Sequence, residues 1–296
     1  MSRPADYGAL LDALRGVSWP SRNPARGVSS GSHRSRLRGI SPEFTEYRPY
    51  RQGDDPRRLD WKLLARTDRA YLRLTSDRAT LGTVVVVDAS GSMAFPLDGH
   101  EKWVRACEIA VGLLAVAHAA GDPVGLVVPT PARVHVLGPL ARWSVVAEAA
   151  RLLSAIEPAG ATDLGPAVRA VRTHHRVAII SDFLSFDDAA RSLVRVARER
   201  SAAGADVSAV HVIAREEIAP RQAAMLAFDP EHPEVKRPLT DATIAGYRAA
   251  FDTWRTELAR EWRQAGASYA EVVTDEPAAH AVRRIVGSGR SMAEQA

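Results

Sequence analysis

Oxygen-bearing side chains occupy alternate positions directly after a run of four valines. The stretch VVVVDASGSM places Asp88, Ser90 and Ser92 behind valines 84–87, and Gly91 allows a sharp bend between the serines. A carboxylate and two hydroxyls are hard oxygen donors, which suit Mg²⁺, Mn²⁺ or Ca²⁺ better than zinc. The spacing therefore indicates a divalent-cation site, with a serine nucleophile as the competing interpretation.

Two later stretches carry the same kind of group. In PAGATDLG, Thr162 and Asp163 precede a predicted helix, and in AIISDF, Asp182 ends a second apolar run. Taken singly, such residues are typical of turns and helix caps, and Asp163 fits an N-cap. Taken together, Asp88 and Asp182 carry two negative charges, which would balance one divalent cation.

The elements that must position these loops alternate between strands and helices from residue 82 onward. Apolar runs predict buried strands, the segments between them have helical spacing, and 123–138 reads as a hairpin. The strands are predicted at 82–88, 123–129, 132–138, 176–182, 205–214 and 267–274, and the helices at 101–120, 141–156, 164–174, 187–204, 240–265 and 275–287. This order predicts an α/β fold with a mostly parallel sheet and helices on both faces. In such sheets ligands bind beyond the carboxyl ends of the strands, where Asp88 and Asp182 lie.

The chain before residue 82 has a different character. A short amphipathic helix with Leu10, Leu11 and Leu14 on one face precedes a stretch rich in Ser, Pro, Gly and Arg. Residues 59–67 predict a short helix and residues 70–76 an edge strand, so an extended or β segment precedes the main sheet. A second small hairpin is predicted within residues 224–240.

Composition excludes several classes of protein. The single cysteine, Cys107, excludes an internal disulfide framework and is predicted to be buried on a helix. The first 80 residues hold 16 Lys/Arg against 9 Asp/Glu, but no recognition motif accompanies this charge, so we expect no nucleic-acid binding. The N-terminus lacks the apolar core of a signal peptide, and no apolar stretch is long enough for a transmembrane segment. We therefore expect a cytoplasmic protein.

The three polar loops resemble the metal-ion-dependent adhesion site (MIDAS) of von Willebrand factor A domains. In that family the site is D-x-S-x-S, then a threonine, then an aspartate, and the matching residues are Asp88, Ser90, Ser92, Thr162 and Asp182. The resemblance implies that both serines ligate the ion, that the aspartates act mainly through water, and that the threonine acts directly or through water. It also implies an open coordination position that an Asp or Glu of a partner protein fills. The third loop departs from the family, because phenylalanine follows its aspartate where glycine is common.

A second resemblance lies upstream, in EYRPYRQGDDPRRLDWKLLARTDRAYLR, residues 46–73. This stretch is similar to the signature of domain-of-unknown-function family 58, a bacterial family in which it precedes a von Willebrand factor A-like domain. The residues in register are Arg48, Tyr50, Gly53, Asp54, Arg57, Leu59, Asp60, Trp61, Lys62, Ala65 and Arg66. The resemblance implies a partnership with a MoxR-type AAA+ ATPase and the short form without membrane helices. The resemblance covers roughly residues 38–285. We therefore expect the signature segment over 40–80 and the von Willebrand factor A-like domain over 81–288, with a partly flexible extension over 1–39 and a flexible tail over 289–296.

The signature segment has two interpretations. It is either a rigid brace that packs on the sheet or a surface on which a partner docks. Asp54 and Asp60 are predicted to pair with nearby arginines, and Trp61 to anchor the segment on the core.

The expected function is that of a non-enzymatic, metal-dependent adaptor that binds proteins and works with the ATPase in maturing or assembling clients. Mg²⁺ is the expected ion, with Mn²⁺ and Ca²⁺ as alternatives. The histidines show no arrangement that would supply a catalytic base, and the G-x-S-x-G turn is absent at Ser90. A Mg²⁺-dependent hydrolase and a metal-free structural domain are the competing hypotheses.

Overall fold

The computed structural model separates the chain into two compact units. One comprises residues 1–23 and 82–296, here called the main unit, and the other comprises residues 24–81. The described residues are 7–21, 30–34, 44–50, 59–75, 78–79, 82–97, 99, 101–171, 176–184, 188–220, 226–228, 236–238 and 240–288.

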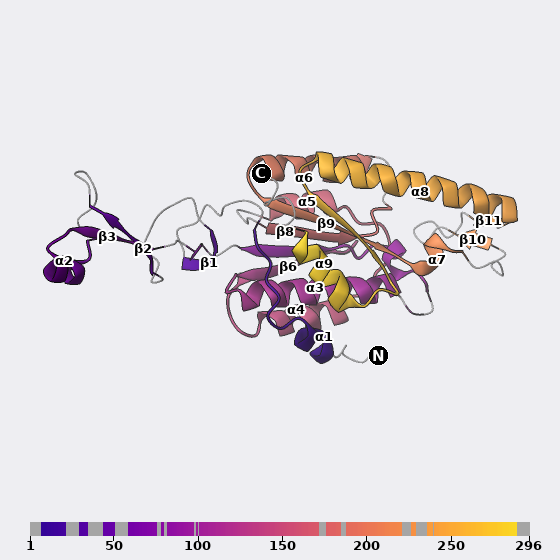
Figure 1. Cartoon of the computed structure of the whole chain (residues 1–296). Coiled ribbons are helices and arrows are strands. Elements are labelled where there is room, and N and C mark those ends of the chain that lie inside the picture. The colour runs from indigo at the N-terminus through magenta and orange to yellow at the C-terminus, as the bar shows by residue number, and fades with distance from the viewer. Residues whose placement is uncertain are drawn as a thin grey trace. The chain divides into compact units, whose positions relative to one another are not determined.

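A six-stranded sheet forms the centre of the main unit (Figure 1). Its strands are β5 (Thr83–Val87), β6 (Val124–Pro129), β7 (Val134–Leu140), β8 (Arg176–Ser181), β9 (Asp206–Ile213) and β12 (Ser268–Val273). They lie in the order β12-β9-β8-β5-β6-β7, and every pairing is parallel except that of β6 with β7. The predicted mostly parallel sheet and the predicted hairpin of β6 and β7 are therefore confirmed.

Helices cover both faces of this sheet, as predicted (Figure 1). The helices are α1 (Gly8–Ala13), α3 (Glu101–Ala119), α4 (Val145–Ser154), α5 (Leu164–Ala170), α6 (Asp188–Ala202), α8 (Asp241–Gln264) and α9 (Ala278–Gly287). One hydrophobic cluster joins the sheet to α3, α4 and α9, with Leu14 packed in after α1. A second cluster joins the opposite face to α5, α6 and α8. Cys107 lies buried in the first cluster, as predicted.

Strand β5 explains why the valine run is continuous. It pairs with β6 on one side and β8 on the other, so its backbone hydrogen bonds lie within the sheet. Val85 and Val87 enter the first cluster while Val84 and Val86 enter the second, because successive side chains point to opposite faces. A strand buried on both faces needs apolar residues at every position.

The amino ends of the parallel strands enclose a buried arginine. Arg176, the first residue of β8, is fully buried and lies over the ring of Trp19 at 4.2 Å. Its guanidinium donates to the Trp19 carbonyl oxygen at 2.7 Å and lies 3.5 Å from Asp122 and 4.0 Å from Asp206. This cluster ties the segment after α1 to the sheet.

In its described residues, the smaller unit contains two antiparallel strand pairs and one helix. Its elements are β1 (Ser30–Arg34), β2 (Phe44–Pro49), α2 (Trp61–Thr67), β3 (Tyr71–Thr75) and β4 (Arg78–Ala79). Strand β2 pairs with β3 and β1 with β4, so the helix and strand predicted for residues 59–76 are present.

The signature residues divide between described and undescribed positions. Gly53, Asp54 and Arg57 lie outside the described residues, as does the side chain of Arg48, whose backbone pairs with Leu72. The others occupy described positions, namely Tyr50 after β2, Leu59 and Asp60 before α2, and Trp61, Lys62, Ala65 and Arg66 within α2.

Two of these signature residues have a defined structural setting. The carboxylate of Asp60 caps α2 by accepting from the backbone N–H groups of Lys62 and Leu63, both at 3.0 Å. Trp61 is the first residue of α2 and is 64% exposed, and α2 has no buried residue. The predicted anchoring of Trp61 on the core would be a contact between the two units, so it stays a prediction.

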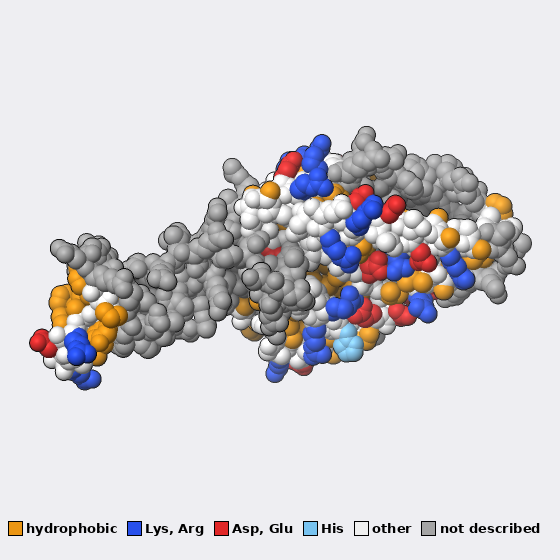
Figure 2. Space-filling view, turned by 45° about the horizontal axis from the view of Figure 1, so that its top comes forward, with side chains coloured by type: hydrophobic (Ala, Val, Ile, Leu, Met, Phe, Trp, Pro, Cys, Tyr) orange, Lys and Arg blue, Asp and Glu red, His pale blue; other side chains and the backbone are white. Residues whose placement is uncertain are grey.

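Further short elements of the main unit follow strand β9. They are α7 (Arg215–Ile218), which follows β9 directly, and the predicted small hairpin of β10 (Leu226–Phe228) and β11 (Lys236–Pro238). On the face shown in Figure 2, basic and acidic side chains of the main unit are interspersed. None of the helices in the described part of the chain is long and apolar enough to cross a membrane.

Candidate functional site

The first polar loop begins where β5 ends. The carboxylate of Asp88 accepts a hydrogen bond from the backbone N–H of Ser90 at 2.9 Å, which turns the chain back toward the strand. The short 3₁₀ helix η2 (Gly91–Ala94) follows, and the hydroxyl oxygens of Ser90 and Ser92 lie 3.1 Å apart. All three side chains are buried, so their polar atoms face one another.

The second polar loop lies directly against the first. Gly91 donates its N–H to the carbonyl of Gly160 at 2.7 Å, and this contact joins the two backbones. The hydroxyl of Thr162 donates to the Asp88 carboxylate at 2.7 Å. Asp163 caps α5 by accepting from the N–H of Gly165, which confirms its predicted role as an N-cap.

The third polar loop completes the cluster at the carboxyl end of β8. Ser181 donates its hydroxyl to the second oxygen of Asp88 at 2.6 Å. Asp182 accepts from the N–H of Leu184 at 3.2 Å and is hydrogen-bonded to the Ser92 side chain. The structure thus brings all five predicted ligands together, although three separate loops supply them.

Phe183 follows Asp182 at the position where von Willebrand factor A domains commonly have glycine. The backbone at this position nevertheless has a conformation that suits glycine. Phe183 has φ +52°, in the left-handed region that glycine adopts most readily. Its buried ring packs against Trp262 and His211, with ring centroids 5.0 and 5.8 Å away. Packing of the ring therefore holds the loop in a conformation that a non-glycine residue seldom adopts.

Two further residues of the cluster, Lys102 and Glu217, were not predicted from the sequence. Lys102 is the second residue of α3 and is fully buried. Its Nζ atom lies 2.7 Å from Asp182 Oδ2 and 2.7 Å from Glu217 Oε1. Glu217, in α7, accepts the N–H of Ala214 with its other oxygen at 2.7 Å. The side-chain ammonium group of Lys102 and the carboxylate of Glu217 therefore also belong to this site, which contains three carboxylates among the described residues.

A signal for Lys102 was present in the sequence. The chain has only three lysines, and this one lies four and seven residues before the buried Ala106 and Ile109. A lysine on the apolar face of a helix must be paired inside the protein, because burying an unpaired charge is costly. Glu217 follows the end of the parallel strand β9. Because ligands bind beyond the carboxyl ends of such strands, this position also indicated that Glu217 lies at the same edge of the sheet as the site.

Burial and neighbouring charges raise the pKa of two carboxyl groups of the site and lower the pKa of the third. Burial, reinforced by the nearby charge of Asp182, raises the pKa of Asp88 above its ordinary value. Burial would also raise the pKa of Asp182, but the Lys102 ammonium outweighs it and the pKa is lowered. Burial raises the pKa of Glu217 despite the same lysine. The ammonium thus stabilises the ionised form of Asp182 most strongly.

Lys102 and His211, the histidine that packs against Phe183, differ in charge. Burial alone would lower the pKa of Lys102, but Asp182 and Glu217 outweigh burial and raise it, so the ammonium form is favoured. Burial lowers the pKa of His211 to about 4, and its Nδ1 is hydrogen-bonded to the Tyr269 hydroxyl at 2.6 Å. At neutral pH the histidine is uncharged, so the lysine is the cation of this cluster.

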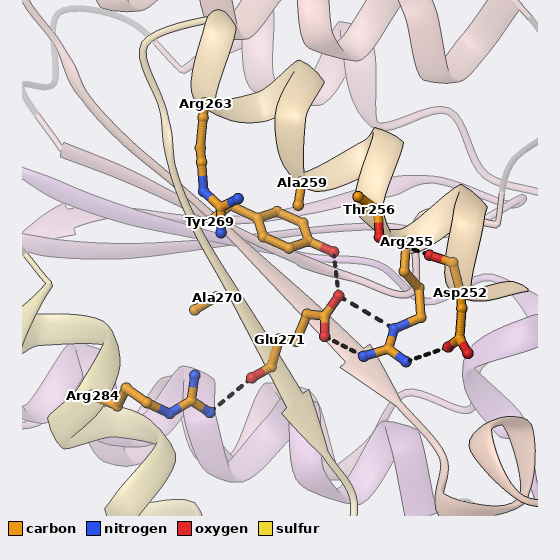
Figure 3. Close-up of a pocket in the computed structure, with 9 residues that line it drawn as sticks. All are labelled: Asp252, Arg255, Thr256, Ala259, Arg263, Tyr269, Ala270, Glu271 and Arg284. Carbon is orange, nitrogen blue, oxygen red and sulfur yellow. Dashed lines mark hydrogen bonds and ion pairs between the residues drawn. The ribbon is translucent and has the colours of Figure 1, made fainter.

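A separate pocket of about 510 Å³ lies between α8, β12 and α9 (Figure 3). Arg255 and Glu271 form an ion pair across it at 2.5 Å, and Arg284 donates to the Glu271 carbonyl oxygen at 2.7 Å. Arg263 points over the Tyr269 ring from the side of α8, 5.7 Å from its centroid. None of the five predicted ligands lines this pocket.

The oxygen set at the strand ends fits a hard divalent cation, although it depends on hydroxyl groups. Among the described residues, no three His, Cys, Asp or Glu side chains are grouped so that they could hold a metal ion. An ion here would need Ser90, Ser92 or Thr162 beside the aspartates. Hydroxyl and carboxylate oxygens are the donors that Mg²⁺ and Mn²⁺ accept.

Comparison with known proteins places the chain in a family. The family model described as "Protein of unknown function DUF58" matches residues 46–259, more than half of the chain. The chain belongs to this family. The DUF58 protein is 28% identical to "Uncharacterized protein Rv1480" of Mycobacterium tuberculosis (strain ATCC 25618 / H37Rv) over 299 residues, which cover 96% of this chain and 91% of that protein.

Solved structures are also similar to this chain. BatB, a conserved hypothetical protein from Bacteroides thetaiotaomicron, aligns with a TM-score of 0.42 and 18% identity over 70% of this chain and 97% of its own. The VWA domain of SpRpn10 aligns with a TM-score of 0.39 and 9% identity over 69% of this chain and 94% of its own.

Proposed function

We propose that this DUF58 protein is a non-enzymatic adaptor that binds another protein through a divalent cation at the strand-end site. Asp88, Ser90, Ser92, Thr162 and Asp182 would hold the ion, either directly or through water. The ion would supply an open coordination position for a carboxylate of the partner. A carboxylate on a divalent ion is a strong and directional contact when it is shielded from water.

One observation carries the proposal, namely the 3.1 Å separation of the Ser90 and Ser92 hydroxyl oxygens. Two neighbouring ligands of an octahedral Mg²⁺, each about 2.1 Å from the ion, lie about 3.0 Å apart. The two hydroxyls are therefore spaced as adjacent ligands of one small cation would be. The Asp88 carboxylate, held by Thr162 and Ser181, provides negative charge beside them.

Mg²⁺ is the ion we propose first, because its size matches this spacing and its ligands are hard oxygens. Mn²⁺ has the same ligand preferences and offers a convenient probe. Ca²⁺ takes longer bonds and more ligands, so it would require the serine oxygens to separate.

The proposed partner is a protein that presents an exposed Asp or Glu, and a MoxR-type AAA+ ATPase is the partner that resemblance to the family suggests. Membership of the DUF58 family supports this choice. In that role the protein would act in the maturation or assembly of client proteins, without covalent chemistry of its own.

A metal-free structural role is the second candidate, and Lys102 is the observation that favours it. Its ammonium already supplies positive charge to Asp182 and Glu217 at 2.7 Å. On this hypothesis the loops keep their mutual hydrogen bonds and no ion enters.

A binding experiment separates the two candidates. Titration of the full chain with Mn²⁺ and Mg²⁺ by calorimetry, with EDTA-treated protein as the start, is expected to show one site. The double variant Ser90→Ala/Ser92→Ala is expected to lose it, whereas Ser154→Ala, an exposed serine on α4, is expected to retain it. Pull-down of a purified AAA+ ATPase should then require the ion and be lost in EDTA. Binding of the ATPase by the double variant in EDTA would refute the proposed mechanism.

A further inference from the structure

Lys102 brings a positive charge to one of the predicted ligands, Asp182. It enters the cluster from α3, whereas the predicted ligands come from the loops after β5, α4 and β8. Two of the contacts of its ammonium are the 2.7 Å pairs with Asp182 and Glu217, and a third is the Phe95 ring, 5.7 Å from Nζ to the centroid. The side chain is only 1% exposed, so solvent does not screen these contacts.

The charges of the cluster do not cancel among its own members. Asp88, Asp182 and Glu217 carry three negative charges when ionised, and Lys102 carries one positive charge. A divalent ion would bring this sum to zero, so the site retains an attraction for a cation although it already contains one. The attraction is weaker than it would be without the lysine, because like charges a few ångströms apart repel strongly in a buried site.

The ammonium of Lys102 also pairs with one particular oxygen of a predicted ligand, Oδ2 of Asp182. Asp182 Oδ2 is 2.7 Å from Nζ, and Asp182 Oδ1 accepts the N–H of Leu184. An ion that enters must share the Asp182 carboxylate with the ammonium. The side chain of Lys102 therefore acts on the ion through both its charge and its hydrogen bond.

We propose that Lys102 is a built-in competitor of the divalent cation, which keeps the site weak for the ion until a partner adds its own carboxylate. This inference rests on the proposed metal-dependent function and adds its regulation. A partner's Asp or Glu contributes one more negative charge, which offsets the ammonium and increases the affinity of the site for the ion. Metal and partner would then bind cooperatively, because each ligand stabilises the state that the other requires.

The test measures Mn²⁺ affinity of the full chain by calorimetry or by electron paramagnetic resonance. Lys102→Gln removes the charge and keeps a hydrogen-bond donor, and is expected to bind Mn²⁺ about tenfold or more tightly than the natural protein. Lys62→Gln is the matched control, since Lys62 is exposed and belongs to the other unit, and its affinity should be unchanged. Glu217→Gln removes a carboxylate and keeps the lysine, and should weaken Mn²⁺ binding by about threefold or more.

The outcomes separate this inference from the proposed function. Equal Mn²⁺ affinity of Lys102→Gln and the natural protein would overturn the inference and leave the metal-dependent function standing. Absence of Mn²⁺ binding in both proteins would overturn the function and the inference together. If Lys102→Gln fails to fold in EDTA, recovery of its circular dichroism spectrum on adding Mn²⁺ supports the inference. If it folds in neither condition, an unchanged affinity of Glu217→Gln overturns the inference.

Discussion

One buried basic residue lies at the amino ends of the parallel strands of the central sheet, and another lies near their carboxyl ends. The two are held in different ways. At the amino end Arg176 stacks on Trp19 and donates to a backbone carbonyl, while its two carboxylates lie 3.5 and 4.0 Å away. At the carboxyl end Lys102 is held by two carboxylates at 2.7 Å each. Both side chains are fully buried, and both belong to the main unit.

The difference lies in what surrounds the charges. An aromatic ring and a peptide carbonyl hold the guanidinium in addition to its two carboxylates. The ammonium pairs with Asp182, whose loop belongs to the same site as Asp88 and the hydroxyls of Ser90 and Ser92. Such oxygen groups are typical ligands of a small cation. We conclude that the amino-end cluster locks the fold, whereas the carboxyl-end cluster combines a structural ion pair with the oxygen groups that a metal would need.

The largest expected effect is on stability, and it comes from the amino-end cluster. Arg176→Met would leave the buried carboxylates of Asp122 and Asp206 without the guanidinium, and should lower the free energy of unfolding by about 4 kcal/mol. Urea denaturation in EDTA and again in Mg²⁺ should give the same loss. Recovery of stability by Mg²⁺ in this variant would erase the distinction between the two clusters.

The next effect tests the carboxyl-end cluster by the same measurement. Lys102→Met would leave Asp182 and Glu217 buried without the ammonium, and should lower the free energy of unfolding by about 3 kcal/mol in EDTA. Saturating Mn²⁺ is expected to restore roughly half of that loss, because an ion that binds only the folded state stabilises it. An identical loss with and without Mn²⁺ would mean that this lysine, like Arg176, is purely structural.

A smaller effect should follow from loosening the aromatic contact of Arg176. Trp19→Leu removes the cation–π contact and part of the buried ring, and should lower the free energy of unfolding by about 2 kcal/mol. Hydrogen exchange of α1 should increase, while Mn²⁺ affinity stays unchanged. Trp143→Leu is the control, because that side chain is 91% exposed and its replacement should change stability by less than about 0.5 kcal/mol.

The smallest effect on stability should come from a single hydroxyl of the candidate site. Thr162→Ala removes the hydrogen bond to Asp88 and should lower the free energy of unfolding by about 1 kcal/mol. It should also raise the pKa of Asp88 further, because that hydrogen bond favours the ionised carboxylate. Mn²⁺ affinity, measured by calorimetry, should fall. Thr253→Ala serves as the control, since that hydroxyl bonds only to the carbonyl of Ala249 on the exposed side of α8.

Much of the fold could be predicted because its signals are local. The valine run before Asp88 predicted a strand buried on both faces, and β5 is buried at every position. The hairpin of β6 and β7 and the helix cap at Asp163 were likewise recognised from short stretches. In each case the neighbours in sequence are also the neighbours that determine the conformation.

The failures concern contacts between distant segments. Lys102 contacts residues 80 and 115 positions later in the chain. No local period or motif expresses such a pairing.

The sequence alone determined the order of strands and helices and the convergence of three polar loops at one sheet edge. Parallel strands bring their carboxyl ends to the same side, so Asp88 and Asp182 were predicted at one edge of the sheet. That β5 and β8 are neighbours in the sheet was decided by the tertiary structure. Only the tertiary structure decided the electrostatics of the site. Packing of α3 and α7 places a buried ammonium between Asp182 and a third carboxylate, that of Glu217. A buried charge acts strongly on groups that are far from it along the chain.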